Sequence, residues 1–347
     1  MNTRFLVTII LSILVIILML WVSNPSEFAD KLQNINLKFI LLVIGLYFAN
    51  VFTKAYRWYL LVNSTGVRVP FKKTFPFFII GLAFNNVTPG KIGGEPIRAY
   101  LLKKDADVPV GQGLASILTE KIMDIIVIAT MAIIGAAFIL PLLSAGEAKI
   151  LIILLIFVIS VITATLIILS HAGIFARIVN ALVKFSAKRP NNKFVSKWTS
   201  ALVGFVDKFK LGISKIFEAK RTAGGCIVLT VIIWINEALR LYIIFWAMPG
   251  VSGTSLGAVF IAASIANILG IVMPLGSGNI FGIGAVFIAL GMEPSSASLA
   301  GFLHAATSVW ISIPMGVGAM LITGYKGPEN SNGDKNQDNS NKKSIKS

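Results

Sequence analysis

Long apolar runs recur along this chain and constrain its fold more than any other feature. The runs at residues 5–22, 38–62, 114–140 and 223–248 each approach or exceed the roughly 20 residues that an α-helix needs to cross a bilayer. Of the 347 residues, 56% are apolar and only 13% are charged. Soluble domains carry about a quarter charged residues. The sequence therefore predicts an all-α fold, a polytopic bundle of transmembrane helices.

Further membrane segments are expected between and after these runs. Residues 149–170 are predicted to span, and so are residues 297–323, with Pro314 as a break. Residues 257–292 form either two short spans or one membrane hairpin. We therefore expect about seven or eight membrane segments, one or two of them re-entrant broken helices, and a short loop over residues 24–37.

Basic residues outside the apolar runs indicate how the chain is oriented. The net charge is +16, and residues 172–221 hold 11 Lys and Arg against two acids. Apolar positions at helical spacing make this region a basic amphipathic insert within a membrane domain at 1–323, followed by a disordered tail at 324–347. By the positive-inside rule, the insert and both termini are cytoplasmic in a multi-pass protein of the cell membrane.

The same charge bears on partners. No basic-aromatic module accompanies it, so the sequence predicts membrane lipids with anionic head groups as partners, and no nucleic acid. It does not determine the oligomeric state.

Residues 85–104 form a glycine- and proline-broken, charged stretch between two apolar segments. Backbone of this kind persists at membrane depth only where protein or water covers it. A helix that starts at Pro96 would direct free N–H groups and a positive dipole end at a lipid phosphate. The predicted substrate-binding residues are Lys91, Gly93, Gly94, Glu95 and Arg98. A tight turn with snorkelling basic side chains is the alternative.

Charged residues also fall inside the predicted spans. Glu120 and Asp124 share a helix face, so a cation from Lys121, Arg98 or Arg57 must pair with them, or one must be protonated. Glu237 and Arg240, three residues apart, can pair within their own helix. The predicted intramembrane charge network is Arg57, Glu120, Lys121, Asp124, Glu237 and Arg240. Both a transport role and a purely structural ion-pair network remain open.

A second break follows in the C-terminal half, at Pro274, Gly276, Gly278 and Asn279. Asn267, Pro274, Gly276 and Gly278 of this half echo Asn86, Pro89, Gly93 and Gly94 of the first half. Two broken helices that face one midplane cavity from opposite sides are typical of transporters with inverted repeats. Chance placement of glycine and proline is the alternative interpretation.

Motifs for chemistry are not found. The sequence has no P-loop, no metal-ligand cluster and no Ser/His/Asp pattern, and its single cysteine, Cys226, excludes an intrachain disulfide. We therefore predict no metal, no cofactor and no catalytic residue, and we do not expect an enzyme.

The segment TPGKIGGEPIRAYLLKK, followed by TEKIMD, resembles the family of lysylphosphatidylglycerol synthase transmembrane regions and their stand-alone flippase-like relatives. The resemblance covers residues 1–323. In that family a Pro-x-x-x-Gly-Glu-x-x-Arg element precedes a Glu-Arg/Lys-x-x-Asp element. The matching positions here, with a looser spacing to the proline, are Pro89, Gly94, Glu95, Arg98, Glu120, Lys121 and Asp124.

The chain departs from its relatives at the second break, where PLGSGNIFGIGA lacks the glutamate usual there. This puts in doubt any role for a carboxylate at that position. The soluble aminoacyl-transfer domain of the full synthases is not expected either. The resemblance implies that an anionic lipid or lipid-linked head group is moved between leaflets. A membrane-embedded transferase that uses a lipid-linked donor and a non-transporting scaffold subunit are the alternatives.

Overall fold

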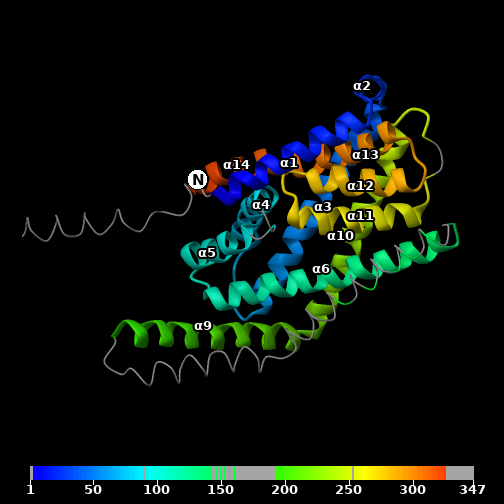
Figure 1. The fold of residues 1–347 in the computed structure, drawn as a ribbon. Helices are drawn as coiled ribbons and strands as arrows, with labels where there is room; N and C mark the ends of the chain where they lie inside the picture. The colour runs from blue at the N-terminus through cyan, green and yellow to red at the C-terminus, as the bar shows by residue number, and fades with distance from the viewer. Residues whose placement is uncertain are drawn as a thin grey trace, which may run out of the picture.

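In the computed structural model, every regular element of the described residues is a helix (Figure 1). The structure describes residues 3–88, 91, 93–142, 193–251 and 254–325, with isolated positions between 146 and 160. The predicted all-α bundle is confirmed for this part of the chain. Most of the predicted span at 149–170, residues 172–192 of the predicted basic insert and nearly all of the predicted tail lie outside the described residues.

The described residues form a succession of helices along the chain. In order they are α1 (Thr3–Val22), α2 (Pro25–Gln33), α3 (Leu37–Ser64), α4 (Phe71–Val87), α5 (Gly94–Ala106), α6 (Val110–Ile139), η2 (Leu140–Leu142), α9 (Lys193–Glu218), α10 (Lys220–Ala247), α11 (Leu256–Val272), α12 (Ser277–Ala289), α13 (Pro294–Ala305), η3 (Ala306–Trp310) and α14 (Ile311–Thr323).

Within the described residues, four helical stretches are long and apolar enough to cross a membrane: α3, α6, α10 and the continuous run of α13, η3 and α14. Each has 28 or 30 residues, and at 1.5 Å per residue this exceeds the roughly 30 Å hydrocarbon core. α1 and α2 meet at 88° and make a fifth candidate. The total of seven or eight membrane segments stays a prediction.

Two local expectations were wrong. Residues 24–37 are not a simple loop, because Pro25 starts the short helix α2. Lys31 of α2 pairs with Glu27 at 2.8 Å and reaches Glu293, which precedes α13. Pro314 does not break the last span. The helix α14 continues through Pro314. The irregular part of this span is the π turn η3, which ends at Trp310, four residues before the proline. Proline has no N–H, so it cannot donate to the carbonyl of Trp310 as a regular helix residue would.

Two pairs of shorter helices fold back on themselves as hairpins. The first hairpin is α4 and α5, with 17 and 13 residues, and the second is α11 and α12, with the same two lengths. Seventeen residues rise about 26 Å, which is short of the bilayer core. Residues 257–292 thus form a hairpin rather than two complete spans.

The tips of the two hairpins meet inside the bundle. Figure 1 shows the hairpins on opposite sides of the molecule with their tips toward one another. The backbone N–H of Leu275 donates to the carbonyl of Asn86 at 2.9 Å, and the Asn86 amide donates to Ser312 Oγ at 2.7 Å. The bond between Leu275 and Asn86 joins the two tips directly, so the two broken helices face one another.

Each hairpin closes through a glycine pair. A Cβ on Gly94 would lie 1.9 Å from the carbonyl oxygen of Gly81, and a Cβ on Gly278 would lie 2.4 Å from the backbone nitrogen of Gly270. Only hydrogen fits at such distances, so these glycines permit helix-to-helix contact. The glycines that we predicted to approach a ligand approach another helix instead.

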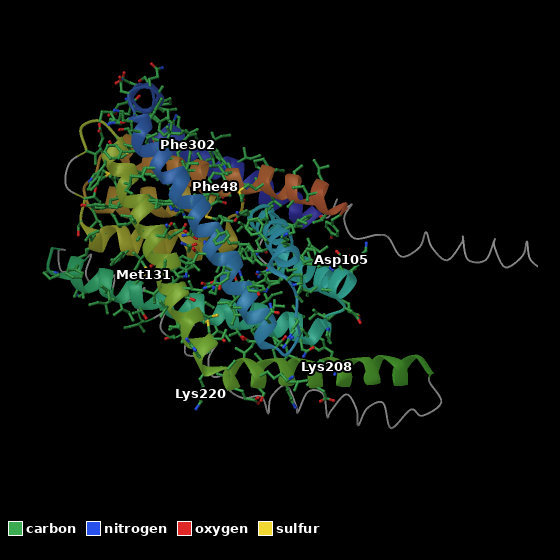
Figure 2. The ribbon with its side chains drawn as sticks, turned by 180° about the vertical axis from the view of Figure 1, so that it is seen from behind. Phe48, Asp105, Met131, Lys208, Lys220 and Phe302 are labelled. Atoms are coloured by element: carbon green, nitrogen blue, oxygen red, sulfur yellow. The ribbon has the colours of Figure 1, made fainter. Side chains whose placement is uncertain are left out.

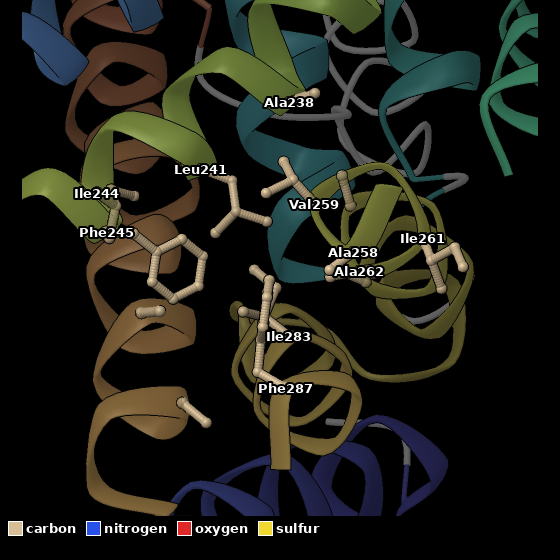
Figure 3. Packing of buried hydrophobic residues seen from close by; sticks show 14 of the residues in the cluster. Ala238, Leu241, Ile244, Phe245, Ala258, Val259, Ile261, Ala262, Ile283 and Phe287 are labelled. Atoms are coloured by element: carbon tan, nitrogen blue, oxygen red, sulfur yellow. The ribbon is translucent and has the colours of Figure 1, made fainter. Parts of the chain in front are cut away.

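Two hydrophobic clusters hold the hairpins in place. One joins α10 to the second hairpin and α13, where Phe245 and Phe287 meet edge to face at 4.5 Å (Figure 3). The other joins α3 to the first hairpin and contains Trp58 and Phe78. Since α3 contributes to both clusters, it connects the two halves of the bundle.

α9 lies along the start of α6 and buries Val206, Gly212 and Ile216. Its exposed side chains include Lys208 and Phe217. Figure 2 shows Lys208 at one edge of the molecule, near Lys220. The helix has the predicted amphipathic pattern, and its position at the cytoplasmic membrane surface stays a prediction.

The glycine contact of the first hairpin can be tested by adding a side chain. Gly94→Ala should lower the thermal unfolding midpoint in detergent, because overpacking of this kind costs about 1–3 kcal/mol. Gly225→Ala in α10 is the matched control, since nothing lies within 4 Å of its Cβ position. Equal midpoints for the two variants would show that the hairpin is not closed by this contact.

Candidate functional site

A cavity of about 150 Å³ lies where the hairpin tips meet. A cavity needs a volume of roughly 10–15 Å³ to hold one water molecule, so this cavity has room for a much larger polar group. Its lining comes from both halves of the chain. The lining residues are Tyr47, Val51, Lys54, Arg57, Phe78, Leu82, Asn85, Asn86, Lys91, Arg98, Glu120, Lys121, Asp124, Trp234, Glu237, Arg240, Asn267, Asn279, Ser308 and Val309.

Arg57 of α3 is the centre of a first group of charges. Its side chain is 1% exposed, and its two terminal nitrogens bind Asp124 at 2.7 and 3.0 Å and Glu120 at 3.1 Å. Thr230 of α10 accepts a further hydrogen bond at 2.7 Å. A bidentate guanidinium–carboxylate pair of this kind is strong and directional. It fixes α3, α6 and α10 relative to one another.

Arg98 of α5 completes this group. It donates to Glu120 at 2.9 Å, lies 3.6 Å from Glu95, and its guanidinium stacks over Trp58 and Phe78. Lys121 pairs with Glu95 at 2.8 Å. We call these six residues the first charge cluster: Arg57, Glu95, Arg98, Glu120, Lys121 and Asp124.

The first charge cluster is balanced. Its three cations face three carboxylates, and every carboxylate lies within 4 Å of at least one cation. The sequence required such a cation for Glu120 and Asp124, and Arg57 and Arg98 occupy that place. The predicted phosphate ligand Arg98 is therefore already engaged by Glu120 and Glu95.

A second group of charges lies on the other side of the cavity. Glu237 of α10 pairs with Arg240 at 2.7 Å, with Lys54 of α3 at 3.6 Å, and faces Nε2 of His304 at 3.6 Å. Lys91, at the tip of the first hairpin, is within electrostatic range of Lys121 of the first charge cluster and of Glu237 and Lys54. It is counted with Glu237, the carboxylate among these three neighbours. We call this set the second charge cluster: Lys54, Lys91, Glu237, Arg240 and His304.

The second charge cluster carries excess positive charge. Its single carboxylate faces three cations, with His304 counted as neutral. Lys91 makes no ion pair within 4 Å among the described residues. Arg240 is 1% exposed, and its Nε and Nη1 have no hydrogen-bond partner in that part of the chain. An anion in the cavity would meet these unpaired donors.

The backbone at the first break differs from the prediction. α5 starts at Gly94 rather than at Pro96. The N–H of Gly94 donates to Asn85 Oδ1 at 2.7 Å, and the N–H of Gly93 donates to Thr88 Oγ1 at 3.1 Å. Asn85 of α4 and Thr88, which follows α4, thus accept hydrogen bonds from the N–H groups of the two predicted glycines, so these two groups are not free for a phosphate.

The second break contributes one side chain to the cavity, that of Asn279, whose amide lies 3.0 Å from Nδ1 of His304. Gly276 has φ +86° and turns the chain into α12. Pro274 accepts the N–H of Ser277 within this turn. Of the predicted set, only Asn279 is placed to meet a ligand.

Several lining residues were not in the predicted site. Lys54 lies three positions before Arg57, so the helical spacing of the two cations was an available signal. Trp234 precedes Glu237 by the same spacing, and it donates to Asp124 at 2.9 Å. His304 had no sequence partner nearby, and only the fold brings it to Glu237.

Comparison with known proteins gives a consistent result over most of the chain. Residues 9–316 match the family described as "Lysylphosphatidylglycerol synthase TM region". A "UPF0104 membrane protein" of Methanothermobacter thermautotrophicus is 26% identical over 93% of this chain and 97% of its own length. UPF0104 membrane proteins of Pyrococcus horikoshii and Methanocaldococcus jannaschii are each 25% identical, over 90% and 92% of this chain and 95% of their own lengths. No solved structure matches.

Removing Arg57 should destabilise the bundle strongly. Arg57→Met leaves Glu120 and Asp124 with fewer counter-charges, and an uncompensated buried charge costs about 3–5 kcal/mol. The free energy of unfolding in mixed micelles measures the loss, and adding Asp124→Asn should restore part of it.

Lys103→Met is the matched control for Arg57→Met. Its pair with Asp107 is exposed, so its loss should change stability by about 0–1 kcal/mol. If the two variants lose equal stability, the first charge cluster does not hold the bundle together.

Proposed function

Because this chain belongs to the family of lysylphosphatidylglycerol synthase transmembrane regions, we propose that it moves an anionic lipid or lipid-linked head group from one membrane leaflet to the other. The family match and the long apolar helices make it a multi-pass membrane protein. The proposal adds a substrate class and an activity to this.

One observation carries the proposal: the cavity at the hairpin tips contains more positive than negative charge. The lining includes six Lys and Arg side chains against three carboxylates, and Glu95, just behind it, pairs with Lys121. Cations that lack counter-charges are costly inside an apolar bundle, and they are generally functional there. An anionic head group would supply the missing charge.

The position of the cavity supports movement of that head group. A phosphate cannot cross hydrocarbon unaided, because a bare charge in an apolar medium is very unfavourable. The fixed ammonium and guanidinium groups that line the cavity would replace the hydration water that the phosphate loses. The acyl chains of the lipid can stay in the bilayer while the head group passes.

The paired hairpins support a path with access from both sides. In transporters with inverted repeats, the substrate site lies between two broken helices near the midplane. Here the backbone N–H of Leu275 in the second tip donates to the carbonyl of Asn86 in the first tip at 2.9 Å. Separation of the tips on one side at a time would expose the cavity alternately.

The names of the relatives agree with a lipid substrate without specifying one. The family description refers to the synthase of a phospholipid, and the archaeal relatives are named only as membrane proteins. The transferase and the scaffold alternatives predict different results in the same experiment, so that experiment separates all three.

Purified protein in liposomes should equilibrate a fluorescent phosphatidylglycerol between leaflets, measured as the fraction that an impermeant reductant bleaches. Protein-free vesicles should bleach only their outer half. Lys91→Gln should slow the exchange about tenfold or more, since a hydrogen bond to a charged group contributes about 1.5–3 kcal/mol. Lys103→Gln, which removes an exposed lysine, should leave the rate unchanged.

Wild-type vesicles that match empty ones, with and without an imposed proton gradient, would contradict translocation. A new lipid product in the vesicle extract would favour the transferase. A partner that co-purifies, together with full cellular function of the Lys91→Gln variant, would favour the scaffold subunit.

A further inference from the structure

We infer that the cavity holds the phosphate of its ligand at the second charge cluster, between Lys91, Lys54 and Arg240, and not at Arg98. This rests on the proposed function, because it specifies where the proposed head group binds. The ligand chemistry is a phosphate mono- or diester, which a lipid head group and a free phosphate share.

Charge balance distinguishes the two clusters. In the first, three cations and three carboxylates cancel one another, so an anion there must displace Glu120 or Glu95. In the second, Glu237 alone faces Lys54, Lys91 and Arg240. Two positive charges remain. The two negative charges of a phosphomonoester would cancel both, and the single charge of a phosphodiester would cancel one.

Arg240 provides the directional donors. Only Nη2 pairs with Glu237, while Nε and Nη1 are buried and without a partner among the described residues. Arg57 and Arg98, by contrast, leave only Nε unpaired there. The Nε–H and Nη1–H groups point in different directions, so each can donate a separate charge-assisted hydrogen bond to a phosphate oxygen. The guanidinium carbon lies 5.3 Å from the centroid of the Tyr47 ring, a cation–π contact that helps to hold the group in place.

Lys91 brings the first hairpin into the same site. Its backbone has φ +49°, a conformation uncommon for a residue with a side chain. Its ammonium lies against Gly270 of α11, 2.5 Å from where a Cβ would stand, and Asn279 Oδ1 lies 3.7 Å from that same point. The side chain of Lys91 thus extends from the first hairpin and contacts the second at Gly270.

A phosphate at this position would therefore contact elements of both halves at once. Lys91 belongs to the first hairpin, and Arg240 belongs to α10, which packs with the second. The ligand would add bonds across the tip contact, so binding and the closure of the tips would favour one another.

Binding to the detergent-solubilised full chain tests this inference. The two probes are dihexanoyl phosphatidylglycerol and inorganic phosphate, each titrated while thermophoresis is recorded. Lys91→Gln should weaken binding at least about tenfold, the effect of losing one charge-assisted contact. Lys103→Gln should bind like wild type.

Gly270→Ala gives a second variant that leaves every charge in place. Its new methyl would displace only the flexible end of Lys91, and alanine suits a helix interior better than glycine. We expect a several-fold loss of affinity with an unchanged or higher unfolding midpoint. Normal binding by both Gly270→Ala and Lys91→Gln would overturn the inference.

Each of two double variants replaces both members of one ion pair, one pair in each cluster. Neither variant therefore leaves one member of the replaced pair charged without the other. Arg240→Gln with Glu237→Gln should abolish binding of both probes, while Arg98→Gln with Glu120→Gln should retain it. The opposite result would place the phosphate at the first charge cluster and refute the assignment.

The probes also separate the ligand source from the site. Binding of the lipid with weaker competition by inorganic phosphate supports a lipid head group, and equal affinities support a free phosphate at the same site. Wild-type lipid exchange that Lys91→Gln leaves intact would refute the site and keep the function. Lys91-dependent binding without lipid exchange would keep the site and refute the function.

Discussion

The pairing of Arg57 with Glu120 and Asp124 is the interaction on which the rest of this structure depends. A buried guanidinium in an apolar bundle is tolerated only when carboxylates surround it, and these two come from a different helix. The pair therefore fixes α3 against α6, while Thr230 and Trp234 extend it to α10. Arg98 adds α5 through Glu120, which places the first hairpin beside the cavity.

The two charge clusters have different tasks on this view. The first is internally balanced and positions helices, as structural ion pairs do. In the second, Nε and Nη1 of Arg240 have no hydrogen-bond partner and Lys91 makes no ion pair within 4 Å in the part of the chain that the structure describes. Burial of charge costs free energy in both cases, and only the second leaves that cost unoffset by the protein itself. That asymmetry is the physical basis for expecting a ligand there.

Much of the local organisation followed from residue order. Apolar run lengths predicted the long helices, and the Gly/Pro breaks predicted the positions of both hairpin turns. The need of Glu120 and Asp124 for a cation restricted their partners to a few residues, among which Arg57 and Arg98 are found. The backbone phosphate site predicted at Pro96 was wrong in its start, since α5 begins at Gly94. Asn85 of α4 and Thr88, which follows α4, bind the N–H groups of Gly94 and Gly93. A side chain nine residues earlier gives no local signal of that contact.

The sequence by itself determined that this chain folds in a lipid bilayer, and it determined the sites where its helices break. Hydrophobic length and glycine–proline chemistry are local properties, so they can be read without the fold. Only the tertiary structure decided which charges cancel. Arg98 and Arg240 look equivalent in the sequence, yet Arg98 meets two carboxylates and Arg240 meets one that it shares with Lys54. Electrostatic pairing depends on distances between separate helices, and those distances exist only once the hairpins have packed through their glycine contacts.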